Sequence, residues 1–230
     1  MFYYIWGHPH KYIAMIDTVI FDMDGVICHT NPYHSQAFEV FFGKRGLQPT
    51  QAQYAQHMYG KSNSYIFSHF LGRTISGDEL QAYEDEKEGL FREIYAEVVN
   101  PIDGFLPFLE QLQAGGFKLG VATSAPTANK DLILSKLGIV EVFGSTLASE
   151  DVNTHKPSPE VYLKSATNLQ STAANCLVFE DSHSGVSAAI NADMKVVGVL
   201  SSHTKTELPP CHRFITRYDE KLYDWLTNLT

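Results

Sequence analysis

One stretch of the chain reads Ile16-Asp17-Thr18-Val19-Ile20-Phe21-Asp22-Met23-Asp24-Gly25. Its first part is a β-branched and mostly apolar run, which predicts a short buried strand. The Asp-x-Asp-Gly that follows is typical of a loop, because Gly25 lets the backbone turn without a side-chain clash. The stretch therefore predicts a strand that ends in two closely spaced acidic side chains.

Helical and strand patterns alternate along the chain after residue 104. Apolar runs predict strands at 118–123, 145–148, 176–180 and 195–200, and helical patterns occupy 105–114, 129–137, 159–168 and 185–192. Such alternation with short loops is typical of an α/β fold with a Rossmann-like parallel sheet covered by helices on both faces. In sheets of this kind, ligands bind beyond the carboxyl ends of the strands.

The segment between the first two strands has a different texture. Residues 34–97 show only helical periodicity, and Gly/Pro-containing hinges flank them at 30–32 and 100–104. This predicts an all-helical domain of residues 31–98, inserted into an α/β core domain of residues 15–30 and 99–230. Residues 1–14 are assigned no function.

Composition excludes several classes of partner. The chain of 230 residues has 17 Lys and Arg against 26 Asp and Glu, a net charge of −9, which disfavours nucleic acid and anionic membranes. No apolar run approaches the ~20 residues of a membrane span. The three cysteines are far apart and form no CxxC pair, so we expect a reducing, cytoplasmic setting. The oligomeric state is open, with a monomer slightly favoured.

Two pairs of acidic residues end strands of the predicted sheet. Asp22 and Asp24 follow the first strand, and Glu180-Asp181 ends another. Carboxylates this close repel one another unless a cation lies between them, and oxygen ligands favour a hard ion such as Mg²⁺. The sequence therefore predicts a Mg²⁺ site at this edge of the sheet.

Two further strand-end loops can bind phosphate. Thr123-Ser124 precedes a predicted helix, where hydroxyls and backbone N–H groups can hold a phosphate oxygen. Lys156 stands before a proline-initiated helix, and its ammonium can supply a counter-charge. Each signal alone is weak, but four suitable groups at one sheet edge favour a functional site.

The motifs resemble those of a known superfamily. They are Phe21-Asp22-Met23-Asp24-Gly25-Val26, Thr123-Ser124, Lys156-Pro157-Ser158-Pro159 and Phe179-Glu180-Asp181-Ser182, in this order. They are similar to the four motifs of the haloacid dehalogenase superfamily, and the resemblance spans the chain from residue 16 on. Within it the chain looks most like the capped phosphatase and β-phosphoglucomutase subgroup, which implies that the helical insertion is a cap.

The resemblance implies phosphoryl transfer through an aspartyl-phosphate. Asp22 is then the nucleophile, and Asp24 protonates the leaving oxygen and later deprotonates water. Mg²⁺ would be held by Asp22, the main-chain carbonyl of Asp24 and Asp181, with Glu180 in support. The equatorial phosphate oxygens would be neutralised by Thr123, Ser124, Ala125 and Lys156.

Other residues give candidate contacts to the substrate. Asn129 lies a helical turn beyond Ser124, and the Thr-x-x-x-His arrangement at the start of the cap is similar to that of β-phosphoglucomutases. The remaining candidates come from a loop that resembles a specificity loop and from a later cap helix. The full set is Asn129, Thr30, His34, Lys61, Ser62, Asn63 and Lys87.

Three functions are compatible with this pattern. The first is a Mg²⁺-dependent phosphatase for a small phosphorylated metabolite, such as a sugar or polyol phosphate. The second is β-phosphoglucomutase. The enzymes of that type that this chain resembles usually have an arginine where this chain has Asn63, and its absence argues against mutase activity. The third is a protein that binds a phosphorylated ligand without turning it over, which the intact set of Asp22, Asp24, Lys156 and Asp181 argues against.

Overall fold

A computed structural model describes residues 15–58 and 62–229. Within them the strands form one six-stranded sheet in the order β3-β2-β1-β4-β5-β6, and every pairing is parallel. The strands are β1 (Thr18–Phe21), β2 (Lys118–Ala122), β3 (Ser145–Leu147), β4 (Cys176–Glu180), β5 (Lys195–Val199) and β6 (Arg213–Ile215). The predicted α/β parallel sheet is confirmed.

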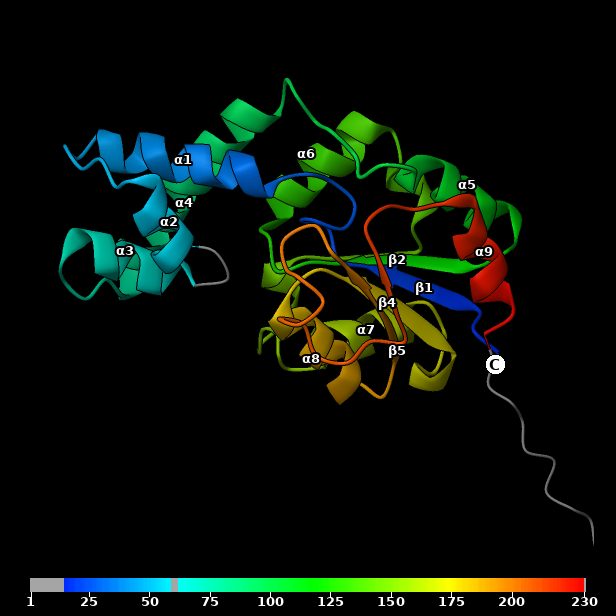
Figure 1. Ribbon diagram of the computed structural model, residues 1–230. Coiled ribbons are helices and arrows are strands. Elements are labelled where there is room, and N and C mark those ends of the chain that lie inside the picture. Colours follow the sequence, from blue (N-terminus) through cyan, green and yellow to red (C-terminus); the bar gives the residue numbers. More distant parts are fainter. Residues whose placement is uncertain (1–14, 59–61, 230) are drawn as a thin grey trace, which may run out of the picture.

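Helices cover both faces of this sheet (Figure 1). One face packs against α5 (Phe105–Ala114), α6 (Thr127–Leu137) and α9 (Glu220–Thr227), and the other packs against α7 (Glu160–Asn168) and α8 (His183–Asn191). Alternate residues of β1 separate the two cores, since Phe21 belongs to the first and Ile20 to the second. Short 3₁₀ helices lie at Val140–Val142, Ser149–Asp151 and Ala173–Asn175.

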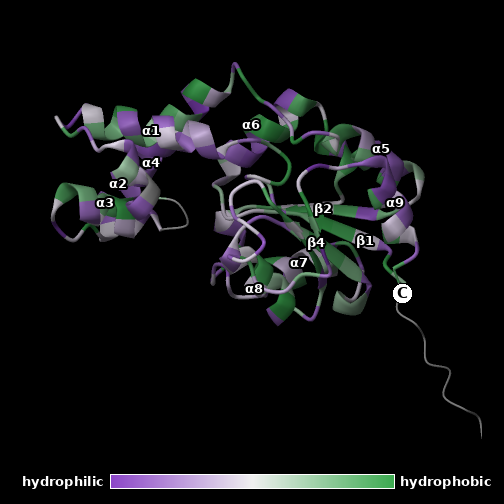
Figure 2. Ribbon diagram, in the orientation of Figure 1, coloured by the Kyte–Doolittle hydropathy of each residue, from purple (hydrophilic) through white to green (hydrophobic). Residues whose placement is uncertain are grey.

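The chain between β1 and α5 forms a group of helices beside the sheet (Figure 1). They are α1 (Asn31–Gly43), α2 (Gln51–His57), α3 (Asn63–Leu71) and α4 (Gly77–Tyr95). Their shared interior is aromatic, with Phe41 and Phe67 at its centre and ring centroids 4.8 Å apart. Figure 2 shows polar and hydrophobic residues interspersed along these helices, whereas the central strands are largely hydrophobic. This is the burial pattern of amphipathic helices around a small core.

The C-terminal part holds two elements that sequence reasoning missed. The edge strand β6 has three residues, too few for a visible alternation. Helix α9 has a recognisable start, because the Asp219 side chain accepts a hydrogen bond from the backbone N–H of Lys221, and Leu222 and Leu226 are buried one turn apart. Along the described stretches of chain, no helix combines the length and apolar character needed to cross a bilayer.

The strand order determines where a ligand can bind. Strands β2 and β3 follow β1 in one direction, and β4, β5 and β6 extend in the other, so the order reverses between β1 and β4. Phe21 pairs with Phe179 in register, so both strands end at the same level. A crevice outside the carboxyl ends of such strands is where doubly wound sheets bind ligands. Asp22 follows β1 there, and Glu180 and Asp181 stand at the end of β4.

Candidate active site

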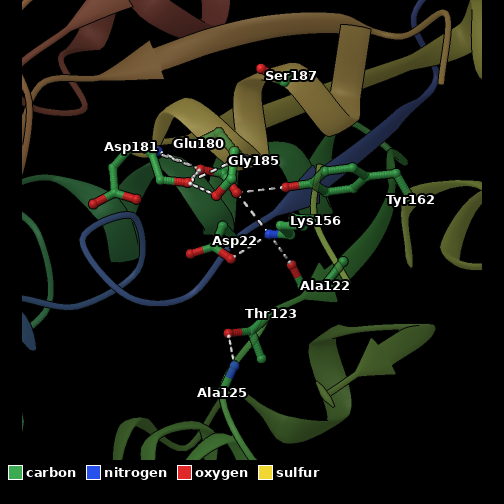
Figure 3. A network of polar contacts seen from close by, with 12 residues as sticks. Asp22, Ala122, Thr123, Ala125, Lys156, Tyr162, Glu180, Asp181, Gly185 and Ser187 are labelled. Carbon is green, nitrogen blue, oxygen red and sulfur yellow. Dashed lines mark hydrogen bonds and ion pairs between the residues drawn. The ribbon is translucent and has the colours of Figure 1, made fainter. Parts of the chain in front are cut away.

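Lys156 joins the ends of three strands through its ammonium (Figure 3). Its Nζ donates to Asp22 Oδ1 at 2.7 Å, to Glu180 Oε1 at 2.7 Å and to the Ala122 carbonyl at 3.0 Å. The Lys156 side chain is only 4% exposed. All three donors of a buried ammonium are therefore used, which is what such burial requires.

Both carboxylate oxygens of Glu180 accept hydrogen bonds. Its Oε1 also accepts from the Tyr162 hydroxyl at 2.9 Å, and its Oε2 accepts from the backbone N–H groups of Asp181 and Ser182, each at 2.9 Å. A Cβ on Gly185 would lie 1.6 Å from Glu180 Oε1, so the first turn of α8 approaches this carboxylate as only glycine allows. These contacts orient Glu180 toward Lys156.

Asp181 contacts a loop that sequence reasoning missed. Its Oδ2 accepts hydrogen bonds from the hydroxyls of Ser202 and Ser201, the latter at 3.4 Å, and its carbonyl oxygen lies 3.0 Å from His203 Nδ1. Ser202 Oγ also accepts from Asn31 Nδ2 at 2.9 Å. The loop after β5 thus connects Asp181 with the start of α1, and no periodic signal marks this connection in the sequence.

Three carboxylates converge at the crevice. Asp22, Glu180 and Asp181 each offer an oxygen within 4.8 Å of the others. Burial is the main cause that raises the pKa of Asp22 to about 7, and although the Lys156 charge opposes it, the charge of Glu180 adds to it. Burial and the neighbouring carboxylates likewise raise the pKa of Asp181 well above its usual range.

This donor set fits a hard divalent cation. The ligand atoms are buried carboxylate oxygens, and burial raises the pKa of Asp22 and Asp181 against the opposing charge of Lys156. Gly25 provides the space that the Asp181 carboxylate occupies. It has φ +73°, and a Cβ there would lie 2.1 Å from Asp181 Oδ2.

The loop after β2 lies beside this cluster. Thr123 is buried, and its Oγ1 accepts from the backbone N–H of Ala125 at 3.0 Å (Figure 3). Ser124 is exposed, whereas Ala125 is buried. Lys156 reaches the adjacent carbonyl of Ala122, so this loop and the lysine meet at one place.

Asp24 faces the helical group rather than Lys156. His34 Nε2 on α1 lies 3.5 Å from Asp24 Oδ1, and His34 stacks on Phe91 with ring centroids 3.9 Å apart. Burial works to raise the pKa of the Asp24 carboxyl, but His34 and Thr30 outweigh it, so the pKa lies below its usual value. Lys87 on α4 donates to His34 Nδ1 at 2.7 Å.

The remaining candidate residues are dispersed. Asn129 is fully buried and hydrogen bonded to two side chains of α4, which sequence reasoning did not single out. Ser62 caps α3 by accepting from the Tyr65 N–H at 3.2 Å, and Asn63 contacts Glu84 of α4. Lys61 lies outside the described residues, as do residues 1–14.

A doubly wound sheet with an inserted helical group and with carboxylates around a lysine at its switch point defines a class of hydrolase. Residues 19–199 match the family model described as haloacid dehalogenase-like hydrolase. The chain belongs to this family.

Similar proteins agree with that assignment. The chain is 30% identical over 184 residues to fructose-1-phosphate phosphatase YqaB of Escherichia coli, which covers 79% of this chain and 95% of that protein. It is 28% identical over 199 residues to protein CbbY of Rhodobacter capsulatus, covering 83% of this chain and 88% of the relative. Among solved structures, a haloacid dehalogenase hydrolase of family IA from Entamoeba histolytica superposes with a TM-score of 0.85 at 24% identity, covering 93% and 100% of the two chains.

Proposed function

We propose that this protein is a Mg²⁺-dependent phosphatase that hydrolyses a sugar or polyol phosphate through an aspartyl-phosphate on Asp22. The observation that carries the proposal is the arrangement of Asp22: one carboxylate oxygen is held by Lys156 at 2.7 Å, and the other points away from the ammonium (Figure 3). A carboxylate fixed in this way can attack phosphorus from one defined direction. The similarity to a fructose-1-phosphate phosphatase supports a phosphoric monoester as substrate.

The side chains of Asp22 and Asp181 and the main-chain carbonyl of Asp24 would hold Mg²⁺, with Glu180 acting through Lys156 and the loop of Asp181. When bound, Mg²⁺ offsets the negative charge of the carboxylates and of the phosphate oxygens. Thr123, Ser124, Ala125 and Lys156 are assigned to the phosphate. The loop residues would offer hydroxyls and backbone N–H groups to its equatorial oxygens, and the Lys156 ammonium, whose protons are engaged by Asp22, Glu180 and the Ala122 carbonyl, would act through its charge.

Two half-reactions follow from these assignments. In the first, an oxygen of Asp22 attacks phosphorus while the ester P–O bond breaks, and Asp24 gives its proton to the leaving oxygen. In the second, water attacks phosphorus, its proton passes to Asp24, and the bond between phosphorus and the Asp22 oxygen breaks. Because the pKa of Asp24 lies below its usual value, its carboxyl is ionised and able to accept a proton in the second step. For the first step, the negative charge of an approaching phosphate raises the affinity of Asp24 for its proton.

The helices α1 to α4 are proposed to act as a cap that closes over the crevice. They are joined to the rest of the chain by residues 30–32 and 100–104, and they carry His34 to Asp24. Closure would exclude water during the first step, and reopening would admit it for the second.

A panel of phosphorylated metabolites tests the function directly. We expect phosphate release from sugar or polyol monophosphates, its loss in EDTA and its recovery with Mg²⁺, whereas Ca²⁺ does not support turnover because its looser shell misaligns the attack. Asp22→Asn should lower kcat by more than about a hundredfold, the scale on which catalytic groups act. Asp193→Asn is the matched control, because Asp193 is exposed and its φ of +57° suits asparagine. Activity in EDTA, or in Asp22→Asn, contradicts the mechanism.

A mutase is the second candidate, and Lys87 keeps it open because it lies at the cap side of the site. A mutase must grip the phosphate that is not transferred, for which a bidentate guanidinium is far better suited than the amide of Asn63. We therefore expect water to win the competition for the aspartyl-phosphate. Phosphorus NMR with β-glucose 1-phosphate and a trace of the 1,6-bisphosphate decides: glucose 6-phosphate ahead of inorganic phosphate would favour the mutase.

We also propose that the protein works in a reducing, cytoplasmic setting, in keeping with its free cysteines Cys28, Cys176 and Cys211. We expect it to bind the small phosphorylated substrate and neither nucleic acid nor a membrane, and to act as a monomer.

A further inference from the structure

A row of buried polar contacts runs from α6, beside the sheet, to the proposed acid and base Asp24. On α6, Asn129 is fully buried. Its Nδ2 donates to Glu88 Oε2 at 2.7 Å, and its Oδ1 accepts from Arg92 Nη1 at 2.9 Å. Both partners belong to α4, so this amide joins the helical group to the sheet domain.

The row continues from α4 to α1. Glu88 Oε1 accepts from Lys87 Nζ at 2.7 Å, and the same ammonium donates to His34 Nδ1 at 2.7 Å. The other ring nitrogen of His34 lies 3.5 Å from Asp24 Oδ1. Glu88 is thus the one residue of the row that contacts both the α6 amide and the lysine beside His34.

The chemistry of each partner leaves little freedom in this row. An ammonium can only donate, so the Nδ1 of a neutral His34 must accept, and its proton then sits on Nε2, toward Asp24. An arginine can only donate and a carboxylate can only accept, so the amide of Asn129 has one allowed orientation. The positions of Lys87 and of the Asn129 amide therefore both depend on the carboxylate of Glu88.

Burial makes these contacts energetically important. Lys87 is 3% exposed and Glu88 is 7% exposed. Burial works to raise the pKa of Glu88, but the charge of Lys87 and the hydrogen bonds from Lys87 and Asn129 act against it, so the pKa lies below its usual value. A buried ion pair tolerates the loss of one partner poorly, because the other charge is left uncompensated.

We infer that Glu88 is a positioning residue, which holds Lys87 and His34 against Asp24 when α4 is docked on α6 through Asn129. This rests on the proposed function, because it assigns Asp24 as the acid and base. It also gives Asn129 a role different from a phosphate contact: its polar atoms are engaged by α4. Docking of the helical group and orientation of the proton-transfer residue are then one event.

A pair of complementary substitutions tests this inference. Glu88→Gln keeps the size of the side chain but places an NH₂ group against a donor, either that of Lys87 or that of Asn129, so one hydrogen bond is lost. Adding Asn129→Asp restores an acceptor for both the new amide and Arg92, and it conserves the net charge. Glu93→Gln is the control, because Glu93 is exposed on the same helix.

The kinetic measurement compares two leaving groups. For fructose 1-phosphate, or the sugar phosphate that the panel selects, kcat/KM includes proton donation by Asp24, whereas 2,4-dinitrophenolate leaves without a proton. We expect Glu88→Gln to lower kcat/KM about tenfold or more for the sugar phosphate and less than about threefold for 2,4-dinitrophenyl phosphate, with recovery in the double variant. Equal losses on both substrates, or no recovery in a folded double variant, would overturn the inference.

Hydrogen exchange separates this inference from the proposed function. The amides of α4 should exchange about tenfold faster in Glu88→Gln and return to the wild-type rate in the double variant, while Glu93→Gln leaves them unchanged. If the wild type hydrolyses no phosphate ester, the proposed function fails, and the inference fails with it as a catalytic assignment. The exchange data then still decide the docking contact, and unchanged exchange in Glu88→Gln would refute that as well. If Glu88→Gln does not fold, the double variant must fold and match the wild type.

Discussion

Replacing the proposed nucleophile should change how the stability of the metal-free protein depends on pH. The Asp22 carboxyl is buried, and its pKa is raised from 3.8 to about 7, first by burial and then by Glu180 and Asp24, against the opposing charge of Lys156. A carboxyl whose pKa is higher in the folded state binds its proton more tightly there. The free energy of unfolding therefore falls as the pH rises from about 4 to about 7. Asp22→Asn removes this group from the titration.

The size of the effect follows from the two pKa values. The interval between 3.8 and about 7, at ~1.36 kcal/mol per pKa unit, corresponds to about 4 kcal/mol when Asp22 is fully ionised in both states. Integrated between pH 4.5 and pH 8, the stability of Asp22→Asn relative to the wild type should rise by about 3 kcal/mol. Comparing the two proteins cancels the contributions of titrating groups that lie away from Asp22.

Urea unfolding in EDTA at several pH values measures this difference, with Asp193→Asn as the control for an Asp to Asn change at the surface. In saturating Mg²⁺ at pH 8 we expect the advantage of Asp22→Asn to shrink or reverse, because the cation stabilises the ionised carboxylate. A difference in unfolding free energy that stays constant from pH 4.5 to pH 8 in EDTA would refute the reasoning.

Two further substitutions probe the same cluster. Gly25→Ala places a methyl group on Asp181 and should weaken Mg²⁺ binding by at least about tenfold in calorimetry, as expected when a ligand's position is disturbed. Gly46→Ala has the same left-handed φ but open space around it, so an equal loss there would disprove the steric explanation. Lys156→Met leaves Asp22 and the carboxylate at the end of β4 without a cation, and we expect a loss of about 3–5 kcal/mol in urea unfolding at pH 8 in EDTA. A loss below about 1 kcal/mol would mean that water already screens this site.

Much of the fold could be predicted because its signals are local. A β-branched run such as Thr18–Phe21 followed by Asp-x-Asp-Gly identifies a strand and its end without knowledge of its neighbours. Parallel strands bring their carboxyl ends to one edge, so the sequence also implied that Asp22, Lys156 and Asp181 would meet. The edge strand Arg213–Ile215 gave no such signal, because three residues are too few to show a period.

Only the tertiary structure decided which side chains support those residues. Nothing near Glu88 in the sequence indicates that its carboxylate meets an amide 41 residues away, or that Ser202 contacts Asp181 and Asn31. Such contacts arise from the docking of helices and loops, whose geometry is set by packing across the whole molecule rather than by local periodicity. The sequence by itself determined the strands of the sheet up to β5 and the groups at their ends, and the three-dimensional packing determined how those groups are held and which of them face one another.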